Sequence, residues 1–547
     1  MKLLGIGGSG HSFSTCIFDE GIKVAIEEER LNKIKHCLVP NTSVEVARAR
    51  AIKYCLGSTG IGIGDLDLIL ADDFINPLYL TRLGSQEVVK VNHHLAHACS
   101  AYYTSPFDEA AVLVADGCGS RAGTDSEGFP LHETTTLYYA KGSEIRELHK
   151  VRGRMPPGSH FPTDSIGEWY SSITQALGYE FLDDGITMGL SAYGTDRFVG
   201  KLQGFYQFDE SGTLLRTVKQ RADMNQFMYD QLREARGEAR FQVAADLAYA
   251  GQIGLERMLI TACRALYDSA RTPNLCMAGG VMFNCAAVAK IRRETPFQNI
   301  YVFPAAGDAG TSIGCALYGH HILGKHGKEN ARFSPYLGHP YRREDCLSAV
   351  DACRAYLVVE ERADLYERVA EFLACGAVVA MFQGRSEFGP RALGNRSILA
   401  DPRSAAMRDR MNARVKRRRP FQPLAPIVLG EYQAEWFESS RPSLYMTELM
   451  HSRLQARERI QAAIHVDGTS RVQTVSDHNH HLYDLLLSFY RLTGTPALLN
   501  TSFNPHGFPM VESPDDAVRA FLDMELDVLV MGGMLIRKSE IARKGGS

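Results

Sequence analysis

Three histidines within five positions are the first residues in this chain that could do chemistry. They are His93, His94 and His97, in the stretch "VKVNHHLAHACSAYY". The stretch predicts a helix, on which His93 and His97 share one face within reach of a single ion, while His94 points away. The glutamate of the zinc-protease pattern H-E-x-x-H is missing, because His94 stands at its position. The alternative is a structural helix whose histidines are satisfied by hydrogen bonds.

Two aspartates have a setting that could complete such a site. Asp116 follows the apolar run "VLVA" and precedes a glycine turn, and Asp308 lies between a predicted strand and the start of a helix. Carboxylates at the ends of strands, beside helix N-termini, are where α/β proteins bind phosphates and their metals. Either aspartate alone would more simply be a helix cap or a turn former. Two imidazoles and two carboxylates together suit a divalent metal such as iron, manganese or zinc.

The elements that must position these residues alternate between strands and helices. A β-meander is predicted in residues 2–30 and again in residues 110–152, which indicates two halves built on one plan. Helical patterns occupy residues 42–60, 241–270 and 309–327. Strands that alternate with helices predict an α/β fold class.

A polar stretch rich in turn formers, residues 325–345, predicts a domain boundary. We therefore expect one domain at 1–340 and a second at 341–547. Beyond the boundary a helix at 363–376 and strands near 377–384, 495–500 and 526–538 restart the α/β pattern.

Glycine clusters recur in the predicted first domain, at 5–10, 278–284 and 307–314. No G-x-x-x-x-G-K-[ST] pattern occurs, so a nucleotide would be held without a P-loop lysine. Glycine turns in two halves, with acidic residues at strand ends, are similar to the ATP fold of actin and the sugar kinases. Gly279, Gly280 and Asn284 of the second cluster are the predicted nucleotide-binding residues of this domain.

The second domain carries cationic residues in four polar segments that we interpret as loops. Guanidinium groups donate paired hydrogen bonds to phosphates and carboxylates, so these segments predict an anion site. The alternative is a surface on which the arginines pair with acidic neighbours. The candidate residues are Arg385, Arg391, Arg396, Lys416, Arg418 and Arg471, with Ser502 and Asn504.

Composition excludes several classes of protein. The 547 residues carry a formal charge of -3 and 45% hydrophobic residues, and no stretch is apolar enough for a membrane helix. The balanced charge is not that of a nucleic-acid-binding protein. Twelve cysteines without a C-x-x-C pair disfavour a zinc knuckle or a disulfide framework. The N-terminal stretch turns polar too early for a signal peptide, so we expect a cytoplasmic protein.

Taken together, the motifs identify a family. The chain resembles the NodU/CmcH O-carbamoyltransferases, which include TobZ-like enzymes of antibiotic biosynthesis. The matching segments run in order from residue 10 to residue 507. They are "GHSFSTCIFDEG", "EEERLNKIKH", "VNHHLAHACSAYY", "VLVADGCG", "TMGLSAYG", "AGGVMFNC", "GDAGTSIG", "EFGPRALGNRSILADP", "HVDGTSRVQTV" and "LLNTSFNPHG".

The resemblance implies an actin-like ATPase domain, close to the tRNA threonylcarbamoyl transferases, followed by a YrdC-like α/β domain. The YrdC-like domain would make carbamoyl adenylate from ATP and carbamoyl phosphate. The first domain would then transfer the carbamoyl group to a hydroxyl of a small natural product. The resemblance also implies site residues. These are metal ligands His93, His97, Asp116 and Asp308, with iron(II) the expected ion; His11 and Lys35 at the transfer centre; and Lys416, Arg418, Arg391, Arg471, Ser502 and Asn504 around ATP and carbamoyl phosphate.

Two positions depart from the family pattern. Ile186 stands where the family has a lysine, in "DGITMGLSAYG", and Gln422 stands where it has an arginine, in "RRPFQPLAP". An arginine bond to an anion is worth about 1.5 to 3 kcal/mol, so Gln422 would weaken carbamoyl phosphate binding unless Arg417 or Arg419 replaces the contact.

Three rival interpretations remain open at the level of sequence. A tRNA threonylcarbamoylation enzyme conflicts with the balanced charge. A hydrogenase-maturation carbamoyltransferase would need an acylphosphatase segment and zinc cysteines, which the chain lacks. An ATP-binding regulator that lost the chemistry conflicts with the intact His and Asp set. The acceptor cannot be read from the sequence, and a homodimer is the expected assembly because dimers are the commonest oligomers.

Overall fold

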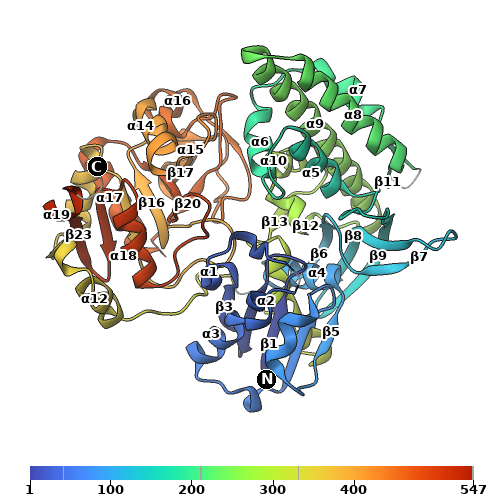
Figure 1. The fold of residues 1–547 in the computed structure, drawn as a ribbon, viewed down its shortest axis with the longest axis horizontal. Coiled ribbons are helices and arrows are strands. Elements are labelled where there is room, and N and C mark those ends of the chain that lie inside the picture. The colour runs from blue at the N-terminus through green and yellow to red at the C-terminus, as the bar shows by residue number, and fades with distance from the viewer. Residues whose placement is uncertain (41, 210–211, 330–331, 478, 545–547) are drawn as a thin grey trace. The chain divides into compact units, whose positions relative to one another are not determined.

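The computed structural model describes residues 1–40, 42–209, 212–329, 332–477 and 479–544. The chain divides into two compact units; most of the second one is coloured from yellow to red in Figure 1. Unit 1 consists of Met1–Glu28 and Cys37–Ser334, and unit 2 of Glu29–His36 and Pro335–Ser547. The later boundary lies close to the expected one at 340, whereas the assignment of Glu29–His36 to unit 2 was not expected. Within the described ranges no helix has the length and apolar character that crossing a membrane requires.

Unit 1 contains two mixed sheets with the same plan, which confirms both the predicted duplication and the α/β fold class. In each, three antiparallel strands form a meander, and two further strands run parallel to the first one. The first sheet contains β1 (Lys2–Gly7), β2 (Ser14–Asp19), β3 (Ile22–Glu27), β4 (Leu68–Asp72) and β5 (Val89–Val91). The second contains β6 (Glu109–Ala115), β8 (Pro130–Lys141), β9 (Glu144–Arg154), β12 (Asn274–Ala278) and β13 (Asn299–Val302), with β7 (Arg121–Thr124) paired to β8.

Two helices that pack against each other connect the sheets of unit 1. Helix α4 (His93–Tyr103) lies on β6 and β12, and α11 (Thr311–Leu317) lies on β1 and β2. The two backbones approach so closely that a Cβ on Gly314 would lie 1.8 Å from the carbonyl oxygen of Ala96. Glycine is therefore required at Gly314, because a real Cβ never comes that near. Beyond Leu317 the predicted helix changes to a π-helical turn, Tyr318–Leu323.

The other helices of unit 1 pack on the sheets or on one another. Helices α2 (Val44–Arg48) and α3 (Arg50–Thr59) replace the single helix predicted at 42–60, because Ala49 has a left-handed φ of 43°. The carboxylate of Glu28 accepts the first amides of α3, from Arg50 and Ala51.

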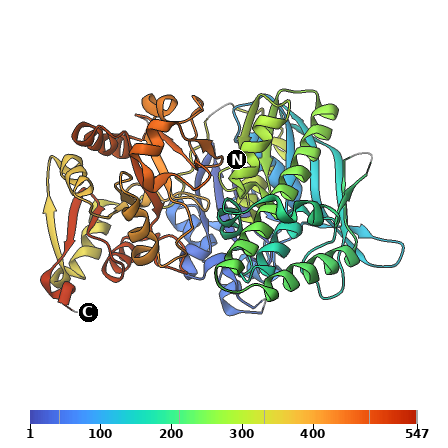
Figure 2. The ribbon, with the colours of Figure 1, turned by 90° about the horizontal axis from the view of Figure 1, so that it is seen from above.

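The long α9 (Gly237–Ala270) lies against the second sheet, among other helices (Figures 1 and 2). These are α5 (Ile166–Ala176), α6 (Asp184–Ser191), α7 (Val199–Gln203), α8 (Val218–Glu234) and α10 (Cys285–Glu294).

Unit 2 is built on one eight-stranded sheet. Its order is β14 (Leu357–Glu361), β23 (Met534–Lys538), β22 (Val528–Met531), β15 (Val379–Phe382), β16 (Arg396–Ala400), β21 (Ala497–Ser502), β17 (Ala425–Leu429) and β20 (Gln473–Val475). Side chains of β15 alternate between two cores: Val379 and Met381 enter one, Ala380 and Phe382 the other. Helices α13 (Leu365–Ala374) and α17 (His480–Thr493) cover the first core, and α12 (Arg343–Asp351) and α18 (Pro514–Asp523) the second.

An early segment of the chain, Glu29–His36, is part of unit 2. It begins with the short α1 (Glu29–Asn32), whose Arg30 side chain is only 1% exposed. Arg30 Nη2 donates a 2.7 Å hydrogen bond to the carbonyl oxygen of Gly389, and Lys33 forms an ion pair with Asp516. These two contacts hold the segment against the loop before β16 and the start of α18.

Candidate functional site

The histidines of α4 lie as the sequence predicted. The side chain of Asn92 caps the helix by accepting the Leu95 amide, so His93 is the first helical residue. The rings of His93 and His97 lie with centroids 4.7 Å apart, and both side chains are fully buried. His94 is turned aside, since its Nδ1 lies 2.7 Å from Thr136 Oγ1.

Asp116 and Asp308 face these histidines. Asp116 follows the last residue of β6, and Asp308 lies in the turn that leads into α11. Single ligand atoms of His93, His97, Asp116 and Asp308 all lie within 4.8 Å of one another. Asp116 Oδ2 is 3.3 Å from His93 Nε2, and Asp308 Oδ1 is 3.8 Å from His97 Nε2. The close packing of α4 and α11 thus brings the four side chains into one cluster, which could hold a metal ion.

Burial and mutual charge shift the pKa of every member of this cluster. Burial alone would lower the pKa of His93, but Asp72 and Asp116 outweigh it and raise that pKa well above its usual value. Burial together with the charge of His93 lowers the pKa of His97 well below its usual value. Burial and the charge of Asp116 raise the pKa of Asp308. Of these shifts, that of His97 favours the neutral imidazole, the form that binds a metal.

His97 tests whether the cluster fits a metal. Neither of its ring nitrogens has a hydrogen-bond partner within the described parts of the chain, although the side chain is fully buried. A buried, unpaired polar atom costs about 1 to 3 kcal/mol. A neutral imidazole is a common ligand of divalent metals, and the two carboxylates would offset their charge. The donor set therefore fits a divalent metal ion.

His11 lies at the edge of the cluster. Its Nδ1 is 3.0 Å from Ser12 Oγ and 3.8 Å from Asp308 Oδ2. Its side chain is 22% exposed, and its ring meets that of Phe181 edge-on at 5.6 Å. A histidine in this position is both close to the cluster and open to a further molecule.

The second predicted group of residues assembles in unit 2 around Lys416. Lys416 is 6% exposed, and its Nζ donates to the carbonyl oxygens of Ser502 at 2.8 Å and Asn504 at 2.9 Å. It also donates to Asn504 Oδ1 at 2.8 Å. Burial, followed by the charges of Arg418 and Lys35, lowers the pKa of Lys416 well below its usual value. A buried amine among cations is a site that an anion would stabilise.

Arg418 and Arg471 extend this cationic site. Arg418 Nε donates to Asn412 Oδ1 at 2.8 Å, and burial with the charge of Arg471 lowers the pKa of Arg418 to about 10. Arg471 lies between the short β19 (Thr469–Ser470) and β20, and its Nε is buried without a partner among the described residues. Arg391 lies in the loop between β15 and β16.

Two other arginines of the predicted anion loops are structural. Arg396 is the first residue of β16 and is fully buried; its guanidinium donates to the carbonyl of Gln383 and lies 3.6 Å from the Phe382 ring centre. Arg385 donates to the carbonyl oxygens of Leu337 and Gly338. Their guanidinium groups hold backbone carbonyls, so each has a structural role beside the predicted one.

The predicted nucleotide residues of unit 1 lie beside Asp116. Gly279 has a φ of 96°, and a Cβ there would lie 2.1 Å from the carbonyl oxygen of Ala115. The Gly280 amide donates to Asp116 Oδ1 at 2.9 Å. Asn284 caps α10 and exchanges hydrogen bonds with Gln252. Gly280 thus contacts Asp116 of the cluster, Gly279 lies against the residue before Asp116, and Asn284 contacts α9. Glycine is required at Gly279 for that close approach.

Two supporting residues were missed by the sequence analysis. Asp72 Oδ2 lies 2.7 Å from His93 Nδ1, and Ser9 Oγ lies 2.5 Å from Asp308 Oδ2. A signal for Asp72 was present: "LILAD" at 68–72 repeats the pattern of "VLVAD" at 112–116, four apolar residues followed by aspartate at a strand end. Ser9 lies in a glycine cluster and offered no comparable signal.

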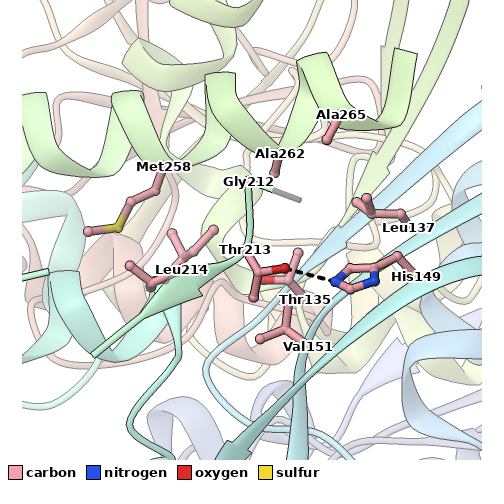
Figure 3. Close-up of a pocket in the computed structure, with 11 residues that line it drawn as sticks. Thr135, Leu137, His149, Val151, Gly212, Thr213, Leu214, Met258, Ala262 and Ala265 are labelled. Atoms are coloured by element: carbon pink, nitrogen blue, oxygen red, sulfur yellow. Dashed lines mark hydrogen bonds between the residues drawn. The ribbon is translucent and has the colours of Figure 1, made fainter. Parts of the chain in front are cut away.

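A pocket elsewhere in unit 1 takes no part in this arrangement. It lies between β8, β9 and α9, beside a hydrogen bond of 2.9 Å between His149 and Thr213 (Figure 3). Its walls are mainly apolar, from Leu137, Val151 and Met258. None of its lining residues belongs to the two clusters described above.

Comparison with known proteins identifies the family. A model described as the carbamoyltransferase N-terminus matches residues 74–317, and one described as the carbamoyltransferase C-terminus matches residues 370–538. A nodulation protein NolNO of Sinorhizobium fredii is 34% identical over 95% of this chain and 78% of its own length. The chain belongs to the carbamoyltransferase family. Its reaction class is accordingly the transfer of a carbamoyl group.

Other relatives of this carbamoyltransferase are found in Bradyrhizobium and Synechocystis. Nodulation protein NolO of Bradyrhizobium diazoefficiens is 35% identical over 82% of this chain and 79% of the relative. An uncharacterized protein of Synechocystis is 32% identical over 98% of this chain and 97% of the relative. Among solved structures, full-length HypF in its phosphate- and nucleotide-bound form has a TM-score of 0.40 at 12% identity, covering 61% of this chain and 56% of HypF. A ROK family glucokinase of Streptomyces griseus has a TM-score of 0.30 at 13% identity, covering 58% and 98% of the two chains.

Proposed function

We propose that this carbamoyltransferase is ATP-dependent and works in two steps, one in each unit. Unit 2 makes carbamoyl adenylate from carbamoyl phosphate and ATP, and unit 1 transfers the carbamoyl group to a hydroxyl of a small molecule. The observation that carries the proposal is the cationic site of unit 2, where the buried ammonium of Lys416 lies near the charges of Arg418 and Lys35, and Arg418 near that of Arg471. Such a site matches phosphate anions.

The proposed first step consists of two reactions, cleavage of carbamoyl phosphate and adenylation of the carbamate. Water cleaves carbamoyl phosphate to carbamate and phosphate, and a carbamate oxygen then displaces pyrophosphate from the α-phosphorus of ATP. Lys416, Arg418 and Arg471 would bind the phosphate oxygens and offset the charge that develops on the leaving groups. We place Lys35 here rather than at the transfer centre, because it lies in unit 2 and its charge reaches Lys416. Ser502, Asn504 and Arg391 would complete the nucleotide contacts.

The second step would take place at the cluster of unit 1. The acceptor oxygen attacks the carbamoyl carbon, its proton leaves, and AMP departs. His11 is the proposed base: its Nδ1 is held near Ser12 Oγ, which leaves Nε2 to take the proton. His93, His97, Asp116 and Asp308 would hold a divalent metal, for which we propose iron(II), and the metal would supply a positive charge beside the phosphate or carbonyl oxygen. Gly279, Gly280 and Asn284 are proposed to contact the nucleotide.

Adenylation explains why two sites are needed. A carbamoyl carbonyl is a poor electrophile because its nitrogen donates electrons to it, whereas a mixed anhydride with AMP provides a good leaving group. Since the anhydride is also open to hydrolysis, it has to be kept from water from its formation until the carbamoyl transfer. A natural-product hydroxyl as acceptor, a role in antibiotic biosynthesis, a cytoplasmic location and a homodimer stay predictions from the sequence.

The test is the release of pyrophosphate and AMP by purified, Fe²⁺-loaded protein. Given ATP and carbamoyl phosphate, we expect pyrophosphate, lost in Lys416→Ala and retained in His93→Ala. AMP release should additionally require a polyhydroxylated acceptor from a panel of natural products. If ATP binds without any pyrophosphate in all these conditions, the ATP-binding regulator becomes the better interpretation. Stimulation by tRNA together with threonine would instead indicate threonylcarbamoylation.

A further inference from the structure

The four side chains of the unit 1 cluster differ in the hydrogen bonds that they form with residues outside the cluster. Asp116 Oδ1 accepts the Gly280 amide at 2.9 Å, and Asp308 Oδ2 accepts the Ser9 hydroxyl. In both carboxylates the other oxygen faces the histidines. His97 has no hydrogen-bond partner on either nitrogen within the described residues. His93 is therefore the one histidine of the cluster that an outer group can hold in place, at least in the part of the chain that the structure describes.

That outer group is Asp72, the last residue of β4. Its side chain is fully buried, and Oδ2 lies 2.7 Å from His93 Nδ1. Its other oxygen, Oδ1, accepts the amide of Phe74 at 2.9 Å. Both oxygens of Asp72 are thus engaged, which fixes the rotation of the carboxylate as well as its place.

The next residue holds the backbone of the same histidine. Asp73 Oδ1 accepts the hydroxyl of Ser120 at 2.5 Å, and Ser120 Oγ accepts the His93 amide at 3.0 Å. The amide of the first helical residue has no partner within the helix, so this contact satisfies a group that would otherwise be unpaired. The end of β4 therefore fixes His93 at two points, the ring and the main chain.

We propose that Asp72 is a positioning residue for the metal site. By accepting the proton on Nδ1 it leaves Nε2, which faces Asp116 and Asp308, as the nitrogen that would bind the metal. A carboxylate that accepts the outer N–H of a ligating histidine fixes its tautomer and makes it a better ligand. Among the described residues His97 has no such partner. Loss of Asp72 would therefore leave both imidazole rings without a hydrogen bond that orients them for the metal. The inference rests on the proposed function, since it assumes that the cluster binds a metal.

Asparagine at this position is a sharp probe. Asp72→Asn has the same shape but only one acceptor oxygen, which cannot serve both the Phe74 amide and His93 Nδ1. If that oxygen keeps the Phe74 amide, the new NH₂ group faces Nδ1 and favours the tautomer with the proton on Nε2. That tautomer has no lone pair directed at the cluster. Metal affinity should fall although the fold is retained.

The experiment measures binding of Co²⁺ alone, by the full-length metal-free protein, from its visible absorption and by competition with a chelator. Fe²⁺ is measured in the same way without oxygen. We expect Asp72→Asn and Asp72→Ala to bind Co²⁺ about 10- to 100-fold more weakly, with an altered spectrum. Thermal unfolding of the metal-free protein should change little for Asp72→Asn, so that a loss of affinity is not a loss of fold.

A matched control is Asp246→Asn. Asp246 is also buried in unit 1, where its Oδ1 accepts the Thr195 amide and the Gln242 side chain. Its replacement should leave Co²⁺ affinity unchanged. Wild-type affinity and spectrum in both Asp72 variants would overturn the inference, as would an equal loss in Asp246→Asn. Failure of the wild type to bind metal, or binding that survives His93→Ala, would instead remove the metal site from the proposed function, and the inference with it.

Discussion

The hydroxyl of Ser9 donates a hydrogen bond to Asp308 Oδ2, with 2.5 Å between two oxygens that are 299 positions apart in the sequence. The same hydroxyl accepts the amide of His11 at 3.3 Å. One small side chain in the first glycine cluster therefore connects a proposed metal ligand to the proposed base. We therefore expect Ser9 to affect the proposed transfer step, which its residue type alone would not indicate.

Ser9→Ala should slow carbamoyl transfer by about tenfold, because a hydrogen bond to a charged group contributes about 1.5 to 3 kcal/mol. Pyrophosphate release should stay at the wild-type rate, since unit 2 does not contain Ser9. Mass spectrometry of the carbamoylated acceptor and a pyrophosphate assay separate the two steps. Ser269→Ala, at the exposed end of α9, is the control. Equal losses in both steps would show that Ser9 acts on folding instead.

Lys416→Met should reduce pyrophosphate release by at least about 100-fold, because it removes the buried donor at the centre of the cationic site. Lys53→Met, on the exposed face of α3, should keep the wild-type rate. The pyrophosphate assay with ATP and carbamoyl phosphate measures both variants. Substantial activity of Lys416→Met would exclude Lys416 from the first step.

Phosphate binding to unit 2 should be coupled to proton uptake. Burial, Arg418 and Lys35 lower the pKa of Lys416, so the free protein binds fewer protons there than an ordinary lysine at mildly alkaline pH. A bound dianion raises that pKa, and protons are therefore taken up rather than released. Calorimetric titration with inorganic phosphate in two buffers of different ionisation enthalpy measures the number of protons. The uptake should disappear in Lys416→Met; proton release by the wild type would contradict the assignment.

Gly314→Ala should destabilise unit 1 by about 3 kcal/mol or more, because the new Cβ would overlap the Ala96 carbonyl oxygen at 1.8 Å. Separation of α4 from α11 should also weaken metal binding, since the helices carry or lead into the cluster. Gly57→Ala in α3 meets nothing within 4 Å and should be neutral or stabilising by up to about 1 kcal/mol. Thermal unfolding compares the two variants. Similar melting temperatures would show that the helices can move apart at little cost.

The metal cluster was the part of the site most accessible from sequence. A four-residue spacing and two strand-end aspartates are local patterns, and the structure brings His93, His97, Asp116 and Asp308 together. The duplicated meander could be predicted for the same reason, because each strand carries its own periodicity. Asp72 shows the same local pattern, but its contact with His93 depends on α4, the helix that follows β5.

What could not be predicted depends on burial and on long-range contacts. Arg396 and Lys416 are both cations in loop-like segments and both donate to backbone carbonyls, but Arg396 lies over the Phe382 ring, whereas Lys416 lies near the charges of Arg418 and Lys35. Residue type and neighbouring sequence do not distinguish the environments of these two side chains. Lys35 likewise lies in a segment whose position in unit 2 follows from contacts with Gly389 and Asp516, more than 350 positions later.

The passage of Glu29–His36 into unit 2 has a consequence for the order of folding. A ribosome completes these residues long before it makes Gly389 and Asp516, so the contacts of Arg30 and Lys33 with those two residues cannot form while most of the chain is synthesised. A fragment that starts at Pro335 would lack a buried part of its own unit, and one that ends at Ser334 would keep a segment that belongs elsewhere. The chain can therefore be separated into two independent proteins only if residues 29–36 are transplanted as well.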